Sequence, residues 1–136
     1  MRKIKKIIIH CSATSPTQYF TAADIRKWHK DKGWSDIGYH RVITRLGVAE
    51  NGRHTEKEGS HAKGHNHDSI GVCLIGGVSV NNEPEFNFTH SQMQTLKWVV
   101  DDYIEVYGPL IVIGHRDLPG VTKACPSFDV RAWWDQ

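Results

Sequence analysis

Runs of apolar residues mark four segments of the chain as strands. Residues 5–11, 70–75 and 110–113 are short, nearly continuous runs rich in isoleucine and valine, and residues 39–44 form a further candidate. Such runs are typical of strands that are buried on both faces of a sheet. The pattern therefore predicts a sheet whose central strands carry few polar positions.

Apolar residues that recur every three or four positions predict the helices between these strands. The first helix begins with Thr21 and ends near Gly33, and the longest begins with Thr89, each with a capping-box partner three residues later. Residues 127–134 predict a short terminal helix. Because strands and helices alternate, we expect an α/β fold with a mixed central sheet flanked by helices, as one domain over residues 1–136.

Turn residues leave one hairpin open between two registers. Asn51-Gly52 is a strong hairpin sequence, and Gly47 is an equally good turn residue. Residues 59–69 are polar and contain glycine, so we expect a surface loop there. Residues 78–88 predict an irregular polar segment before the longest helix.

Composition and charge narrow the function classes. With 39% hydrophobic and 24% charged residues the chain reads as an ordinary globular protein, and a net charge of +2 gives no argument for a nucleic-acid partner. The apolar run after the first lysines is too short for a signal peptide or a membrane span. We expect a monomer that is made in the cytoplasm without a signal peptide and is not inserted in a membrane.

Two histidines occupy similar places relative to the strands. His10 follows the apolar run of the first strand, and His115 follows that of the last. Ligands of open α/β sheets bind beyond the carboxyl ends of strands, so both imidazoles can enter one crevice, and Cys125 is near enough in the chain to join them. Two imidazoles and a thiolate suit zinc, with a fourth position left for water. The alternatives are hydrogen-bonded, partly buried histidines and a small buried cysteine.

Four segments of the chain together resemble a known family. In order, they are IIIHCSAT, WHKDKGWSDIGYH, GSHAKGHNHDSIGVCLIGG and KACPSFDVRAWW. They are similar to segments of the type-2 N-acetylmuramoyl-L-alanine amidases, including those of the phage T7 lysozyme type, and of the peptidoglycan recognition proteins. The resemblance runs from about Ile7 to Trp134, and several long segments in the same order are far more specific than one short motif.

The resemblance implies one catalytic Zn²⁺ held by His10, His115 and Cys125. It also implies that Tyr39 and Lys123 are the catalytic side chains. Zinc would activate water and polarise the carbonyl, Lys123 would stabilise the oxyanion, and Tyr39 would assist proton transfer from the attacking water. The implied substrate is bacterial peptidoglycan, cut at the amide between N-acetylmuramic acid and L-alanine. We expect the enzyme to reach the cell wall by phage-type release.

Three further residues are expected along the substrate groove. The resemblance implies His61; Trp34 suits stacking on a sugar and packing in the core equally well, and His40 adjoins Tyr39 and can support or line the site. A second metal cluster of the loop histidines is a weaker hypothesis than solvated or substrate-facing rings; these are His54, His61, His65 and His67.

Several alternatives stay open at the level of sequence. Tyr39 can simply pack on its sheet, Lys123 can be a solvated lysine, and the leaving amine can take its proton from Tyr39, a histidine or water. Cys11 and Cys73 are expected in the core by alternation along their strands. Two other functions compete with an amidase: a recognition module that binds muropeptide without cutting it, and a zinc site used for stability alone. The presence of all five site residues favours the enzyme.

Overall fold

The computed structural model describes residues 1–136 and contains a five-stranded sheet in the order β3-β2-β4-β1-β5. Neighbouring strands pair in parallel except β3, which pairs antiparallel with β2. The strands are β1 (Lys6–Cys11), β2 (Arg41–Ile43), β3 (Ala49–Asn51), β4 (Ser69–Leu74) and β5 (Ile111–Gly114). The mixed α/β sheet expected from the alternation of strands and helices is confirmed.

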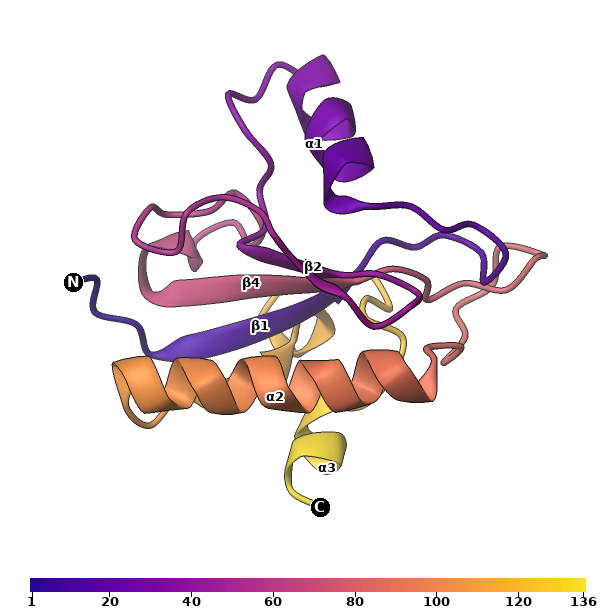
Figure 1. Ribbon diagram of the computed structural model, residues 1–136. Coiled ribbons are helices and arrows are strands. Elements are labelled where there is room, and N and C mark those ends of the chain that lie inside the picture. The colour runs from indigo at the N-terminus through magenta and orange to yellow at the C-terminus, as the bar shows by residue number, and fades with distance from the viewer.

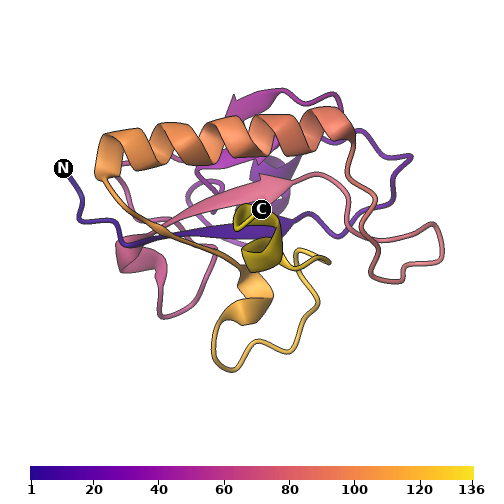
Figure 2. The same cartoon turned by 90° about the horizontal axis from the view of Figure 1, so that it is seen from below.

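Helices cover both faces of this sheet. They are α1 (Ala22–Asp31), α2 (His90–Tyr107) and α3 (Val130–Trp134), with the 3-10 turns η1 (Asn66–Asp68) and η2 (His115–Asp117). Helix α1 stands over one face, and α2 lies along the other (Figure 1). The view from below shows that α3 lies over the same face as α2 (Figure 2). No helix is both long and apolar enough to cross a membrane.

The two faces bury different kinds of core. The face under α2 holds the main cluster, to which Ile7, Ile9 and Leu96 belong. The opposite face holds one cluster against α1 and a separate, smaller cluster around Ile8 and Ile113. Because the apolar packing on this face is divided, polar side chains can reach the sheet between the two clusters.

Both predicted capping boxes are confirmed. The Thr21 hydroxyl accepts a hydrogen bond from the Asp24 N–H, and the Asp24 carboxylate accepts one from the Thr21 N–H. Thr89 and Gln92 make the same reciprocal pair at the start of α2. Each box satisfies backbone donors that the first turn of a helix leaves without partners, which fixes where α1 and α2 begin.

The hairpin register that the sequence left open is set by Gly47. Its N–H donates to the Thr44 carbonyl at 2.8 Å, and its φ of +85° is one that glycine adopts freely. Asn51 ends β3, and Gly52 follows it without making the turn.

Three predicted segments need correction. The strand expected over residues 39–44 shortens to β2, although the carbonyls of Tyr39 and His40 still accept hydrogen bonds from the N–H groups of Arg53 and Gly52. The loop over residues 59–69 is not wholly a surface loop, since His61 and Ala62 are buried. The terminal helix begins at Val130 rather than at Ser127, whose φ of 73° is incompatible with a helix.

Helix α2 is held to the sheet by fully buried apolar side chains, and Leu96 is one of them. We expect Leu96→Ala to lower the free energy of unfolding by about 2–5 kcal/mol, because it removes buried methyl groups and leaves a cavity. Urea denaturation measures the change. Gln94→Ala, at an exposed position of the same helix, is the control and should stay within about 0.5 kcal/mol of the parent. Equal effects of the two variants would contradict the packing described.

Candidate active site

A cavity of about 430 Å³ opens on the sheet face that α1 covers. It lies where the chain leaves the carboxyl ends of β1 and β5, the position expected for a site in a parallel sheet. Seven of the predicted site residues line it: His10, His115, Cys125, Tyr39, Lys123, His61 and Trp34.

Strand pairing brings the three expected metal ligands together. In the parallel register of β1 and β5, Ile9 pairs with Gly114, so the next residues, His10 and His115, lie side by side with ring centroids 4.6 Å apart. The loop after η2 returns to this edge and places the Cys125 sulfur 3.2 Å from the Cys11 backbone nitrogen. One donor atom from each of His10, His115 and Cys125, which we call the metal trio, lies within 4.8 Å of the others.

The surroundings of the metal trio set its charge. Burial, followed by the nearby His61 and His115, holds the pKa of His10 well below its usual value. Burial and the Lys123 ammonium also lower the pKa of His115. Both imidazoles are therefore neutral near pH 7, which is the form that binds a metal. A hydrogen bond with the Cys11 thiol, together with burial, raises the pKa of Cys125, so a cation is needed to displace its proton.

The two expected catalytic side chains approach the metal trio from different segments. The ring of Tyr39 lies 5.1 Å from that of His10, and burial raises the pKa of its hydroxyl well above the usual value. Tyr39 therefore remains a hydrogen-bond donor at neutral pH. Lys123 is exposed on the rim of the cavity, two residues before Cys125, where its ammonium can reach a ligand without being buried.

The three residues expected along the groove occupy different environments. Trp34 is 38% exposed and lines the cavity, with its ring 4.5 Å from that of His29. His61 is buried, and its Nδ1 lies 2.8 Å from Nε2 of His10. His40 lies outside the cavity lining: its Nδ1 accepts the Gly71 N–H and its Nε2 donates to the Lys57 carbonyl. The structure therefore places His40 behind the site, holding two backbone segments together.

Helix α1 contributes a wall that the sequence interpretation missed. Trp28, His29 and Lys32 line the cavity, and none of the three is among the site residues expected from the sequence. Nδ1 of His29 accepts the Gly38 N–H at 2.9 Å, and the His29 ring lies 5.6 Å from that of Tyr39. The helical spacing of these three residues beside the buried stripe is the signal that could have found them.

Cys11 and Cys73 are buried, as alternation along the strands predicts. Cys73 packs in the cluster against α1, and Cys11 joins the main cluster under α2. The sequence did not indicate that Cys11 also touches Cys125.

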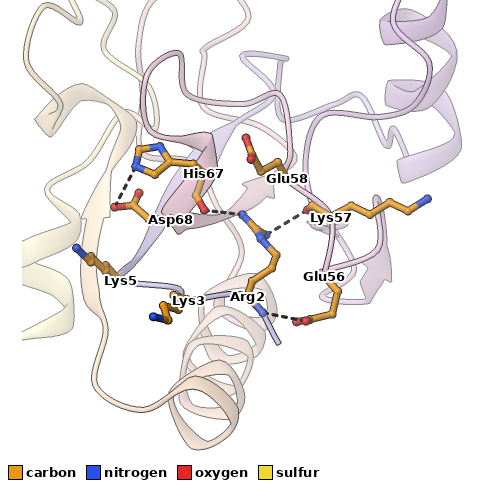
Figure 3. A pocket seen from close by; sticks show the side chains of 8 residues that line it. All are labelled: Arg2, Lys3, Lys5, Glu56, Lys57, Glu58, His67 and Asp68. Atoms are coloured by element: carbon orange, nitrogen blue, oxygen red, sulfur yellow. Dashed lines mark hydrogen bonds and ion pairs between the residues drawn. The ribbon is translucent and has the colours of Figure 1, made fainter.

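A larger pocket of about 630 Å³ lies at the other end of β1, around Arg2 (Figure 3). The side chains that line it are basic residues, acidic residues and one histidine: Arg2, Lys3, Lys5, Glu56, Lys57, Glu58, His67 and Asp68. The Arg2 guanidinium donates hydrogen bonds to backbone carbonyls, including those of Thr55 and Asn66, and so holds two loops together. The smaller cavity, where metal-binding, aromatic and cationic groups meet, is the candidate active site.

Solved structures share this architecture. The amidase LysC from Clostridium intestinale superposes with a TM-score of 0.81 and 26% identity, covering 98% of this chain and 87% of that chain. Drosophila PGRP-LB, 24% identical, gives the same TM-score over 100% of this chain and 82% of that chain, and shows the fold alone. The fold is therefore the α/β fold that amidases and peptidoglycan recognition proteins share.

Sequence comparison gives the family. Residues 1–128 match the family model described as N-acetylmuramoyl-L-alanine amidase. The endolysins of Enterobacteria phage T3 and Escherichia phage T7 are 46% and 45% identical over 130 residues, which cover 96% of this chain and 85% of each relative. The chain belongs to the N-acetylmuramoyl-L-alanine amidase family, and it is an amidase of the endolysin type, so the predicted resemblance and activity are confirmed.

Proposed function

We propose that this amidase binds one zinc ion at the metal trio and cleaves peptidoglycan between N-acetylmuramic acid and L-alanine. The single observation that carries the proposal is the convergence of His10, His115 and Cys125 within 4.8 Å. His10, His115 and Cys125 would hold the ion, and three protein donors are the number that a catalytic zinc site uses. Two neutral imidazoles and one thiol fit zinc by chemistry as well as by spacing.

When bound, zinc supplies a Lewis acid that polarises a carbonyl and lowers the pKa of water. Hydrolysis adds a water oxygen to the lactyl carbonyl carbon and breaks the bond to the alanine nitrogen, which must leave carrying a proton. We assign to the protonated hydroxyl of Tyr39, whose ring lies 5.1 Å from that of His10, a hydrogen bond to the attacking or carbonyl oxygen. Lys123, on the rim beside Cys125, stabilises the negative charge that develops on the carbonyl oxygen.

The remaining lining suits a glycan strand with attached peptide. Trp34 presents an exposed indole, and the Lys32 ammonium lies 5.7 Å from its ring centre. An aromatic face packs against the apolar face of a sugar, so we assign this wall to the substrate. We take the catalytic unit to be a monomer. Its place of action is the cell wall after release from the cell that makes it.

A recognition module that binds muropeptide without cutting it is the alternative. Such a module needs a groove but has no need for Tyr39 and Lys123 beside a set of metal-binding donors. Their common position in one cavity favours hydrolysis.

Metal removal tests the proposal directly. We expect EDTA dialysis to abolish wall lysis and one equivalent of zinc to restore it, because water activation depends on the metal. Mass spectrometry of digested peptidoglycan should show new N-terminal alanine. Full activity after complete metal removal would exclude the zinc mechanism, and new reducing sugar ends would exclude the amide as the bond cleaved.

A further inference from the structure

Behind the metal trio, buried side chains form a continuous line of hydrogen bonds. Nε2 of His10 lies 2.8 Å from Nδ1 of His61, and Nε2 of His61 lies 3.2 Å from the hydroxyl of Ser69. The Ser69 hydroxyl lies 2.7 Å from the His65 carbonyl oxygen. Ser69 is fully buried and both rings are at most 9% exposed, so water does not compete for these contacts.

The last contact fixes the direction of every proton in this line. A carbonyl oxygen only accepts, so the one hydroxyl proton of Ser69 is donated to His65. The Ser69 oxygen must then accept from the Nε2–H of His61. A neutral His61 that is protonated at Nε2 has its lone pair on Nδ1 and accepts from the Nε2–H of His10. His10 therefore carries its own lone pair on Nδ1, a nitrogen for which no protein partner is found.

We propose that His61 and Ser69 are positioning residues that hold His10 as its Nε2–H tautomer, with the Nδ1 lone pair turned toward the metal. This inference rests on the zinc site of the proposed function. It assigns His61 a role behind a ligand, where the sequence indicated a substrate contact. Partners of this kind orient metal-bound histidines and raise their basicity.

The local backbone is built to allow this line. Gly71 pairs with Ile8, two residues before His10, and a Cβ at Gly71 would lie 2.5–2.7 Å from atoms of the His61 ring. Only glycine leaves room for that ring to lie on β4 and reach His10. The Asn66 side chain accepts from the backbone N–H groups of His61 and Ala62, both at 3.0 Å.

Arg2 anchors the outer end of the same loop. Its guanidinium donates to the carbonyls of Asn66 at 2.8 Å and of Ser69 at 3.3 Å. Figure 3 shows the side chain reaching between the segments of Lys57 and His67. The position of the Ser69 hydroxyl is thus held by the fold and does not depend on a bound ligand.

Nuclear magnetic resonance tests the tautomers without a mutation. Long-range ¹H–¹⁵N spectra of the histidine-labelled full chain, zinc-loaded and after dialysis against chelator, should show His61 protonated at Nε2 in both states. His10 should carry its proton on Nε2 and bind zinc through Nδ1. A proton on Nδ1 of either ring overturns the proposal. If the spectra do not change when zinc is added, the chain does not bind zinc. That result overturns the proposed function, and it is distinct from a wrong tautomer.

Variants test whether the hydrogen bonds among His10, His61 and Ser69 contribute to zinc affinity. Ser69→Ala and His61→Leu should weaken zinc binding by about 10–100-fold in competition with a chromophoric chelator. His61→Asn keeps an acceptor near the Nδ1 position and should retain most of the affinity. Thr95→Ala is the control, because its hydroxyl also bonds a carbonyl at 2.7 Å but lies on α2, away from the cavity.

The control separates positioning from stability. Unchanged zinc affinity in Ser69→Ala and His61→Leu, or an equal loss in Thr95→Ala, overturns the proposal. A higher KM of His61→Leu at unchanged zinc affinity would identify His61 as a substrate contact, which also overturns it.

Discussion

Cys125→Ser should lose its zinc and more than about 100-fold in wall-lysing activity. Removing a group that merely hydrogen-bonds a metal ligand already lowers metal affinity or activity by about 10–100-fold, and Cys125 is itself an expected ligand. A serine hydroxyl is a far weaker zinc ligand than a thiolate. The fold should survive, because Cys125 is only half-buried and a hydroxyl can still accept from the Cys11 N–H that the sulfur now contacts at 3.2 Å. Metal content by atomic absorption, lysis rate and thermal unfolding measure the three quantities on one sample.

A second substitution separates loss of the ligand from damage to the loop. Cys125→Asp supplies a carboxylate that zinc accepts, so part of the metal content and activity should return. A Cys125→Ser protein that keeps one zinc and full activity would remove Cys125 from the metal trio. A protein that loses activity only because it unfolds would show a lowered melting temperature.

Lys123→Ala should keep its zinc and fold but lose about 10²–10³-fold in kcat, the usual effect of removing one stabilising donor from an oxyanion. The side chain is exposed on the cavity rim, so its truncation leaves no hole in the core. The loss should appear in kcat more than in KM, because the charge that Lys123 stabilises exists only after attack on the carbonyl. Steady-state kinetics on a soluble muropeptide measures both constants.

The matched control is Lys97→Ala, which removes an exposed lysine that pairs with Asp101 on α2. It should cleave muropeptide at the parent rate. If Lys123→Ala is as fast as Lys97→Ala, Lys123 is a solvated lysine, the alternative that its sequence position left open. A similar loss in both variants would indicate a general effect of net charge on binding to the wall.

The periodic parts of the chain were predictable from the sequence because their physics is local. Strands β1 and β4 follow from their β-branched runs, and the starts of α1 and α2 from capping boxes that span four residues. The hairpin was less determined, because two turn sequences competed and only the pairing of β2 with β3 selects Gly47.

For the candidate site, the sequence predicted which residues take part but not how they come together. The matched segments named His10, His115 and Cys125, and ligand chemistry explained why those residue types suit zinc. Their meeting depends on the parallel register of β1 with β5, which is set by long-range strand pairing and by no local pattern.

The roles of the residues that support the site could not be predicted from the sequence for the same reason. His40 and His61 look alike as polar residues near the site, yet one holds backbone segments and the other bonds His10. Their roles depend on burial and on hydrogen-bond partners brought from other elements, and loops carry no periodicity from which these can be read. The sequence by itself determined the main strands and helices, the family resemblance and the candidate ligands. Only the tertiary structure shows which nitrogen of His10 bonds His61, because the His61 ring is positioned by contacts with Gly71 and Ser69 of a neighbouring strand.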